Sequence, residues 1–435
     1  MFVWKQWCVV SLCLTIILFG FNPFGEVVNA TRDQSPVKNV IFMIPDGFSS
    51  AYATNYRIFN GNEFILDSML VGMMKTHSAS SWVTDSAAAA TAMATGVKTK
   101  NGMIGVDSEG QQLKTILEAS NEAGKSTGLI ATKAITDATP AAFGAHVISR
   151  TQEEEIASQL LEQVDVLFGG GKCHFLPSRQ DKQDLIEEAR SNGYQLIETR
   201  EELIALQGTE KKVLGLFADQ MLAAEIDRDQ TDEPSLAEMT EMAIELLSEN
   251  DEGFFLMVEG SKIDRAGHAH DAAWAMNDIA AFEQAVIKAK DFAEKDAQTL
   301  LLVVGDHDTG GLSVGGYNEY VAKPEMLRNV KASAAFISAQ INNRRTNVQE
   351  VMKEYTNFDF TKKEIKKIKT ASTKEVPFVI GEIISEKAYI DWVTTEHTGV
   401  DVPIYAFGPK AHYFQGHLDN TELPKKIAQA MELTF

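Results

Sequence analysis

The chain has 435 residues, of which 44% are hydrophobic and 23% charged, a composition typical of a globular protein with a large core. Its 61 acidic and 40 basic residues give a net charge of −21, which argues against a broad surface for binding a nucleic-acid backbone. A small anionic substrate remains compatible with this charge, because a pocket that contains metal ions can be locally positive.

The first thirty residues have the pattern of a secretory signal peptide. Lys5 precedes an apolar stretch at 9–21, and Val28, Asn29 and Ala30 form a small-x-small cleavage pattern. We therefore expect cleavage after Ala30 and a secreted mature protein that is periplasmic, extracellular or associated with the cell wall, without a membrane span. The alternative is an uncleaved N-terminal anchor, although the apolar stretch is shorter than the roughly 20 residues that a span needs.

Strand-like apolar runs alternate with helical stretches along the rest of the chain. Strands are expected at 40–44, 127–131, 164–168, 254–258, 300–304 and 403–407. Helices are expected at 113–123, 153–163, 236–249 and 272–294. Near-continuous apolar strands separated by helices are typical of a mostly parallel central sheet with helices on both faces. The sequence thus predicts an α/β fold in which residues 31–435 form a single domain.

Residues from about 319 to 387 have a different composition. They lack strong apolar strands and contain a basic run at 362–369. We expect a small, mostly helical insertion between the last two strands. The basic run is interpreted as the solvated face of a helix, and a contact with an anion or the cell wall is the alternative.

Acidic and imidazole side chains directly follow three of the predicted strands. Asp46 follows the first, Glu259 follows the run at 254–258, and Asp306 and His307 follow the run at 300–304. Ligands of open parallel sheets bind outside the carboxyl ends of the strands. These four side chains are therefore expected to converge on one edge of the sheet.

Asp264 and His268 are four residues apart, which places both on one face of a helix, where they can share a metal ion. His397 lies just before the last strand and adds a further candidate ligand. Aspartate, glutamate and histidine together suit zinc, whereas an all-oxygen set such as Asp46, Thr139 and Glu259 suits magnesium. Any one of these residues alone could be a surface hydrogen-bonding group, but together they indicate a metal centre.

Asp85 and Ser86 stand at the start of an alanine-rich segment that ends at Gly96. Either side chain could cap a helix there. Alternatively, Ser86 could be a nucleophile where the positive end of the helix dipole meets an anion. Arg150 is either a surface charge or a residue whose planar guanidinium group binds two phosphate oxygens. Asp137 is either a turn residue or part of the same site.

In combination, these segments closely resemble the bacterial-type alkaline phosphatases. The segments that carry the resemblance, in chain order, are Ile44-Pro45-Asp46-Gly47, Val83 to Ala88 with its continuation at Gly96-Val97-Lys98-Thr99, Asp137-Ala138-Thr139-Pro140, Val258-Glu259-Gly260, Ile263-Asp264, His268, Gly305-Asp306-His307 and Glu396-His397-Thr398-Gly399. They span essentially all of the chain that follows the expected signal peptide.

The resemblance implies a phosphomonoesterase in which Ser86 is the nucleophile that becomes phosphorylated, with Asp85 beside it and Arg150 on the non-bridging phosphate oxygens. Two zinc ions and one magnesium ion are implied. One zinc ion would be bound by Asp264, His268 and His397, and the other by Asp46, Asp306 and His307, with Ser86 as a further ligand. The magnesium ion would be bound by Asp46, Thr139 and Glu259. Small phosphate monoesters are the implied substrates, and a homodimer is the implied assembly.

Three positions vary within the family that the chain resembles. We hypothesise that Asp137 and Arg265 form an ion pair beside the phosphate, directly or through water. Thr309 stands where some relatives place a histidine that supports the zinc ligands. Two other functions remain open from the sequence: a phosphodiesterase on the same scaffold, and a non-catalytic protein that scavenges phosphate or zinc and has no need of Ser86.

Overall fold

The computed structural model describes residues 37–208 and 211–435, so the expected signal peptide lies outside the described residues. The strands are β1 (Asn39–Pro45), β2 (Leu70–Lys75), β3 (Ser126–Ala134), β4 (Val166–Gly170), β5 (Gln195–Ile197), β6 (Val213–Leu216), β7 (Phe254–Gly260), β8 (Thr299–Val304), β9 (Asp308–Thr309), β10 (His397–Thr398), β11 (Val402–Phe407) and β12 (Gly416–Asp419).

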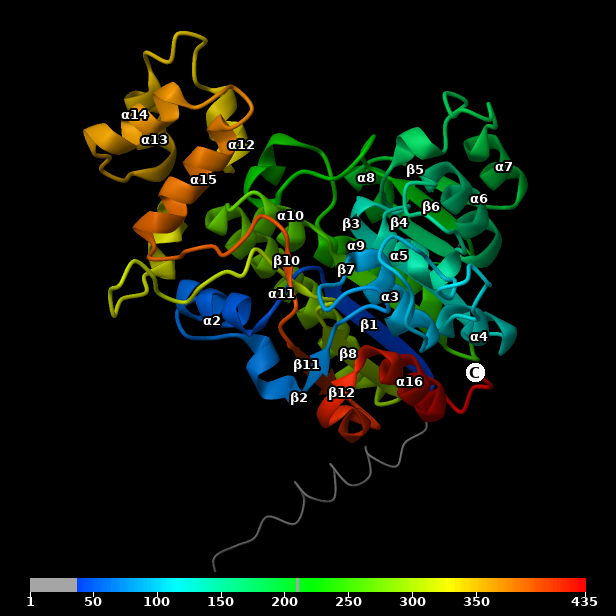
Figure 1. Ribbon diagram of the computed structural model, residues 1–435. Helices are drawn as coiled ribbons and strands as arrows, with labels where there is room; N and C mark the ends of the chain where they lie inside the picture. The colour runs from blue at the N-terminus through cyan, green and yellow to red at the C-terminus, as the bar shows by residue number, and fades with distance from the viewer. Residues whose placement is uncertain (1–36, 209–210) are drawn as a thin grey trace, which may run out of the picture.

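A ten-stranded sheet runs through the centre of the molecule in the order β12-β2-β11-β8-β1-β7-β3-β4-β6-β5 (Figure 1). All neighbouring strands are parallel except β11, which is antiparallel to both β2 and β8. The prediction of a mostly parallel sheet is confirmed. The short strands β9 and β10 form a separate antiparallel pair.

The α-helices are α2 (Ser50–Phe59), α3 (Ser86–Thr95), α4 (Ile116–Glu122), α5 (Ala138–Gly144), α6 (Glu153–Gln163), α7 (Leu185–Ser191), α8 (Arg200–Ile204), α9 (Leu236–Ser248), α10 (Lys262–His268), α11 (Ala272–Asp296), α12 (Ala334–Ala339), α13 (Val348–Thr356), α14 (Lys362–Thr370), α15 (Val376–Lys387) and α16 (Leu423–Met431). Each of the four predicted helices is present. The helix predicted from residue 113 begins later, because Thr115 and Glu118 form a capping box at its start.

Both faces of the central sheet are buried, as the apolar strands predict. Along β1 the side chains of Ile41 and Met43 join one hydrophobic cluster, with residues of α2, α9, α11 and α15. Those of Val40, Phe42 and Ile44 join the other, with residues of α3, α4, α5, α6 and α16. A strand of alternating side-chain direction can be apolar throughout only if helices cover both of its faces.

Helices α12 to α15 lie together at one end of the molecule, between β9 and β10 in the chain (Figure 1). In α14 the side chains of Ile365 and Ile368 are buried, whereas all its lysines are exposed. The basic run is therefore the solvated face of an amphipathic helix. The division of the chain into one domain with an inserted subregion stays a prediction.

His146, just after α5, is held by two partners in the layer that covers the sheet. Its Nε2 lies 2.9 Å from Glu118 Oε1 and its Nδ1 lies 2.7 Å from the Gly105 carbonyl oxygen. Burial lowers the pKa of His146, but Glu118 and the Gly105 carbonyl together raise it by more than burial lowers it, so the pKa lies above its usual value of 6.5. The folded protein therefore favours the charged imidazolium.

This pair predicts a pH-dependent loss of stability. Because the pKa of His146 is higher in the folded state, its contribution is complete below pH 6.5 and is lost as the pH rises through the folded-state value. We expect the free energy of unfolding of native protein to exceed that of His146→Gln by about 1 kcal/mol near pH 6. The difference should shrink toward alkaline pH in urea titrations. A difference that grows with pH would contradict the assignment.

Candidate active site

Strand ends bring the predicted ligands to one edge of the sheet. Asp46 follows β1, Glu259 lies in the adjacent β7 opposite Ile44, and Asp306 and His307 follow β8 on the other side of β1. Each of these four side chains is at most 1% exposed. The predicted convergence is confirmed, and it places several ionisable groups where water cannot screen them.

A first ligand group combines α10 with β10. The four-residue spacing on α10 brings His268 Nε2 to 3.2 Å from Asp264 Oδ1. His397 reaches the same point from β10, with its Nε2 3.2 Å from His268 Nε2 and 3.4 Å from Asp264 Oδ1. Three candidate ligand atoms, two from α10 and one from the distant β10, thus surround one point.

The hydrogen bonds of the two imidazoles fix which nitrogen atoms face that point with a lone pair. His268 Nδ1 lies 2.6 Å from the Thr395 carbonyl oxygen, and His397 Nδ1 lies 2.9 Å from the Thr84 carbonyl oxygen. A carbonyl oxygen only accepts, so each Nδ1 must carry a proton and donate it. With both rings neutral, the two Nε2 atoms would face each other with lone pairs, an arrangement that a metal ion would stabilise.

A second ligand group surrounds His307 Nε2. Asp306 Oδ2 lies 3.2 Å from this nitrogen, Asp46 Oδ1 lies 3.6 Å away, and Ser86 Oγ lies 3.2 Å away. Asp46 Oδ1, Asp306 Oδ2 and Glu259 Oε2 are all buried without a hydrogen-bond partner. Buried carboxylate oxygens without partners are costly unless a cation neutralises them.

The spacing within both groups fits zinc. Tetrahedral zinc with ligands at 2.0–2.1 Å places neighbouring ligand atoms about 3.3 Å apart. The measured separations of 3.2–3.4 Å in the first group and 3.2–3.6 Å in the second agree with that value. The donor atoms are carboxylate oxygens and imidazole nitrogens, which zinc accepts.

The electrostatics of the second group are those of ligands that need a positive charge. Burial, together with the charge of Asp46, raises the pKa of Asp306 well above its usual range. Burial, together with His397, lowers the pKa of His307 well below its usual range. A divalent cation would favour both the ionised carboxylate and the neutral imidazole.

Ser86 is the first residue of α3, and Asp85 rather than Ser86 caps the helix. Asp85 Oδ1 accepts a hydrogen bond from the Ala88 N–H at 3.0 Å, and Oδ2 accepts one from the Gly102 N–H at 3.0 Å. The Ser86 hydroxyl is therefore not used as a cap and lies 3.2 Å from His307 Nε2. A capping carboxylate and a hydroxyl that does not cap thus stand on adjacent residues.

Arg150 is held above the site by two carboxylates. Its Nη1 lies 3.2 Å from Asp85 Oδ2, and its Nη2 lies 3.0 Å from Asp137 Oδ1. Both the guanidinium and Ser86 line a pocket of about 440 Å³, together with Asp264, His268 and His397 and with other residues of the rim. The arginine thus faces the same space as the serine and the first ligand group.

The direct Asp137–Arg265 ion pair is not formed among the described residues. Asp137 instead pairs with Arg150 and with Lys133, whose Nζ lies 3.3 Å from Asp137 Oδ2. Arg265 lines the pocket from the exposed side of α10, whereas Asp137 is directed toward the two buried or half-buried cations. The direct form of the hypothesis is therefore corrected, because the ion pairs of Asp137 beside the site are with Lys133 and Arg150, and the form through water stays a prediction.

Lys133 is the site residue that the sequence analysis missed. It lies near the end of β3, and its Nζ is 3.2 Å from Asp46 Oδ2 and 3.3 Å from Asp264 Oδ2. Burial lowers the pKa of Lys133, but Asp46 and the neighbouring carboxylates together raise it by more than burial lowers it, so Lys133 stays charged. A lysine just after an apolar run resembles a surface residue, and only its four-residue spacing from Asp137 hinted at a pairing.

Two further positions can now be placed. Thr139 is buried in the first turn of α5, whose N-cap is Asp137. His270 has its Nε2 2.9 Å from the Thr394 carbonyl oxygen and stacks on Trp392. It is not part of either ligand group.

Thr309 supports a ligand of the first group. Its hydroxyl donates to Asp264 Oδ1 at 2.6 Å. Partners of this kind orient metal ligands, and their loss typically costs 10–100-fold in metal affinity. We expect Thr309→Val, which keeps the shape and removes the hydroxyl, to weaken zinc binding by about tenfold or more. Competition with a chromophoric chelator measures the change, with Thr54→Val at a partly exposed position of α2 as the control. Equal affinities of native protein and Thr309→Val would contradict the assignment.

A serine at a helix N-terminus, two groups of aspartate and histidine ligands, and an arginine above them define a metal-dependent hydrolase on a mostly parallel α/β sheet. The chain belongs to the alkaline phosphatase family, whose sequence model matches residues 37–433. It is accordingly an enzyme of the phosphoric monoester hydrolase class.

Individual relatives agree with this membership. The chain is 41% identical to alkaline phosphatase 3 of Bacillus subtilis over 96% of each chain. The crystal structure of a cold-active alkaline phosphatase from Shewanella sp. is 36% identical, with a TM-score of 0.84, over 90% of this chain and 99% of that one. A histidine-to-aspartate variant of TAB5 alkaline phosphatase, described with Mg bound in its M3 site, is 29% identical, with a TM-score of 0.71, over 92% of this chain and 99% of that one.

Proposed function

We propose that this chain is a secreted alkaline phosphatase that hydrolyses phosphate monoesters through a phosphoserine on Ser86, with two zinc ions and one magnesium ion bound. The observation that carries the proposal is the position of the Ser86 hydroxyl. It is excluded from helix capping by Asp85, lies 3.2 Å from His307 Nε2 in the second ligand group, and opens on the pocket that Arg150 lines.

The residues of the site would form two binding positions for zinc and one for magnesium. Asp264, His268 and His397 would bind one zinc ion, and Asp46, Asp306 and His307, with Ser86, the other. Asp46, Thr139 and Glu259 offer oxygen ligands for magnesium, which the TAB5 variant is described as binding in its M3 site. Bound zinc lowers the pKa of hydroxyl groups and water and offsets the charge of the transferring phosphoryl group.

The side chains of the protein account for the remaining chemistry. Ser86 Oγ forms a bond to phosphorus while the ester P–O bond breaks and the leaving oxygen takes a proton to become the alcohol. Water then adds to the phosphoserine, the Oγ–P bond breaks, and Ser86 recovers its proton as phosphate leaves. Arg150 can bind two non-bridging oxygens with its planar fork, and Asp85 and Asp137 hold that fork in position.

The proposal is tested by trapping the intermediate. Zinc-loaded protein mixed with p-nitrophenyl phosphate and quenched in acid should carry one phosphate per chain, on the peptide that contains Ser86. Mass spectrometry of the digest locates the modification. A turnover-competent protein whose acid-quenched samples carry no phosphate on Ser86 would overturn the phosphoserine route.

A phosphodiesterase on the same scaffold is distinguished by substrate. The monoesterase proposal predicts that p-nitrophenyl phosphate is hydrolysed far faster than bis-p-nitrophenyl phosphate. The reverse preference would favour the diesterase. A non-catalytic scavenger is not supported, because the chain belongs to an enzyme family and retains Ser86 in the site.

Secretion and dimerisation complete the proposal. The pattern at residues 1–30 supports export, and the described part of the chain contains no helix that is long and apolar enough to cross a membrane. N-terminal sequencing of the secreted protein should begin after Ala30, and light scattering should give twice the mass of the mature chain. An intact N-terminus on a membrane-bound protein would favour the anchor instead.

A further inference from the structure

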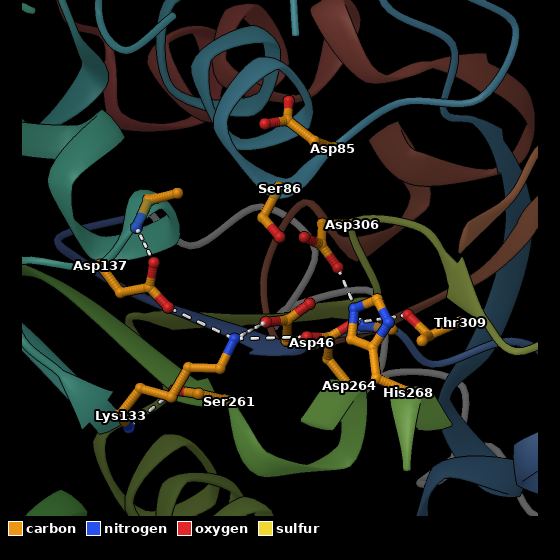
Figure 2. A network of polar contacts seen from close by, with 12 residues as sticks. Asp46, Asp85, Ser86, Lys133, Asp137, Ser261, Asp264, His268, Asp306 and Thr309 are labelled. Carbon is orange, nitrogen blue, oxygen red and sulfur yellow. Dashed lines mark hydrogen bonds and ion pairs between the residues drawn. The ribbon is translucent and has the colours of Figure 1, made fainter. Parts of the chain in front are cut away.

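The Lys133 ammonium lies among carboxylates that are predicted to bind metal ions or that flank the site. Its Nζ lies 3.2 Å from Asp46 Oδ2, 3.3 Å from Asp137 Oδ2 and 3.3 Å from Asp264 Oδ2. The side chain is only 8% exposed. Figure 2 shows it extending from the strand into the centre of these three carboxylates. A buried lysine in contact with three carboxylates is a fixed positive charge within the site.

The two oxygens of Asp46 face different cations. Oδ1 faces His307 Nε2 and has no hydrogen-bond partner, so it is free for the second zinc position. Oδ2 accepts from Lys133 Nζ. If Oδ1 binds zinc, Oδ2 is the Asp46 oxygen that remains for magnesium. The ammonium therefore holds the one oxygen that magnesium would need from this residue.

Backbone contacts keep Lys133 in this place. The N–H groups of Thr132 and Lys133 both donate to Ser261 Oγ at 3.2 Å, and the Ser261 N–H donates to Thr132 Oγ1 at 3.0 Å. These bonds tie the end of β3 to the turn between β7 and α10. The lysine is thus anchored on two elements that also carry Glu259 and Asp264.

We propose that Lys133 is an internal cation that competes with magnesium for Asp46 and neutralises this carboxylate when magnesium is absent. Magnesium binds oxygen at 2.0–2.1 Å, and an ammonium in contact with the same oxygen repels it. Binding of magnesium in the third position must therefore displace the ammonium from Asp46, toward Asp137. The inference rests on the proposed metal positions and adds a residue that controls the occupancy of one of them.

The test compares magnesium binding in zinc-loaded native protein and in Lys133→Met, which keeps an unbranched side chain one atom shorter and removes its charge. We expect isothermal titration calorimetry to show at least about tenfold tighter magnesium binding by the variant. We also expect magnesium to raise the melting temperature of the variant more than that of native protein. Thr139→Val should abolish the heat of magnesium binding if that heat comes from the third position. Lys98→Met is the matched control, because Lys98 forms an ion pair with Asp419 rather than with a residue of the site.

Equal or tighter magnesium binding by native protein would overturn the proposal. If Lys133→Met does not fold, Lys133→Gln replaces it in the same comparison. Failure of the proposed function is a separate result. A zinc-loaded protein without phosphatase activity would refute the function, whereas an active protein with unchanged magnesium affinity in the variant would refute only the role of Lys133.

Discussion

Ser86→Ala is expected to lower kcat for p-nitrophenyl phosphate by at least about 10³-fold, since it removes the atom that bonds to phosphorus. The substitution leaves the cap of α3 intact, because Asp85 rather than Ser86 accepts from the Ala88 N–H. Folding and the melting temperature should therefore change little. Steady-state kinetics on zinc-loaded protein measures the effect, and acid-quenched samples should contain no phosphoserine.

A matched variant separates loss of the nucleophile from a general effect of losing a hydroxyl. Ser248→Ala, at the exposed end of α9, should keep full turnover. Metal analysis of Ser86→Ala should still give two zinc ions per chain, since the aspartate and histidine ligands remain. Unchanged turnover in Ser86→Ala would show that the hydroxyl is not the nucleophile and would revive the scavenger hypothesis.

Asp46→Ala is expected to lower kcat/KM by about 10³-fold or more, through loss of metal rather than loss of the nucleophile. Oδ1 of Asp46 faces the second ligand group and Oδ2 faces Lys133, so one substitution affects two cation positions. Elemental analysis after dialysis should show less zinc per chain than native protein. The Lys133 ammonium would keep Asp137 and Asp264 as partners, so the fold should persist.

The control for Asp46→Ala is another buried carboxylate, away from the site. Glu283 is 6% exposed and accepts hydrogen bonds from the Tyr56 hydroxyl and the Ile65 N–H. Glu283→Ala should lower stability by about 1–3 kcal/mol because it leaves these donors unpaired, yet the zinc content should not change. Equal loss of zinc in both variants would mean that unfolding, and not ligand loss, explains the effect.

The sequence predicts the centre of the fold better than its edges. Strands β1, β7 and β8 are buried on both faces, and uninterrupted apolar residues are a strong signal for such strands. β2 was not predicted, because most of its side chains are at least partly exposed and Gly72 interrupts its apolar residues. The direction of β11 was also beyond prediction, since an apolar run has the same composition whether the strand is parallel or antiparallel.

The ligand groups could be predicted because the ends of apolar strands and the four-residue spacing of a helix can both be recognised in the sequence. Asp264 and His268 meet through their spacing on α10, and Asp46, Glu259 and Asp306 meet through the order of the strands. The pairing of Asp137 could not be predicted in the same way. It depends on how far the Lys133 side chain reaches and on the outward direction of Arg265, which are properties of the packed structure.

The two-residue ladder between β9 and β10 has a consequence for how this enzyme can vary in evolution. Thr309 pairs with His397, and Thr398 Oγ1 donates to Asp308 Oδ2 at 2.7 Å. The ladder fixes His397 relative to His307 directly, so the intervening helices α12 to α15 do not set that separation. Changes in the length or exposed surface of these helices are therefore compatible with an unchanged position of His397 beside His307.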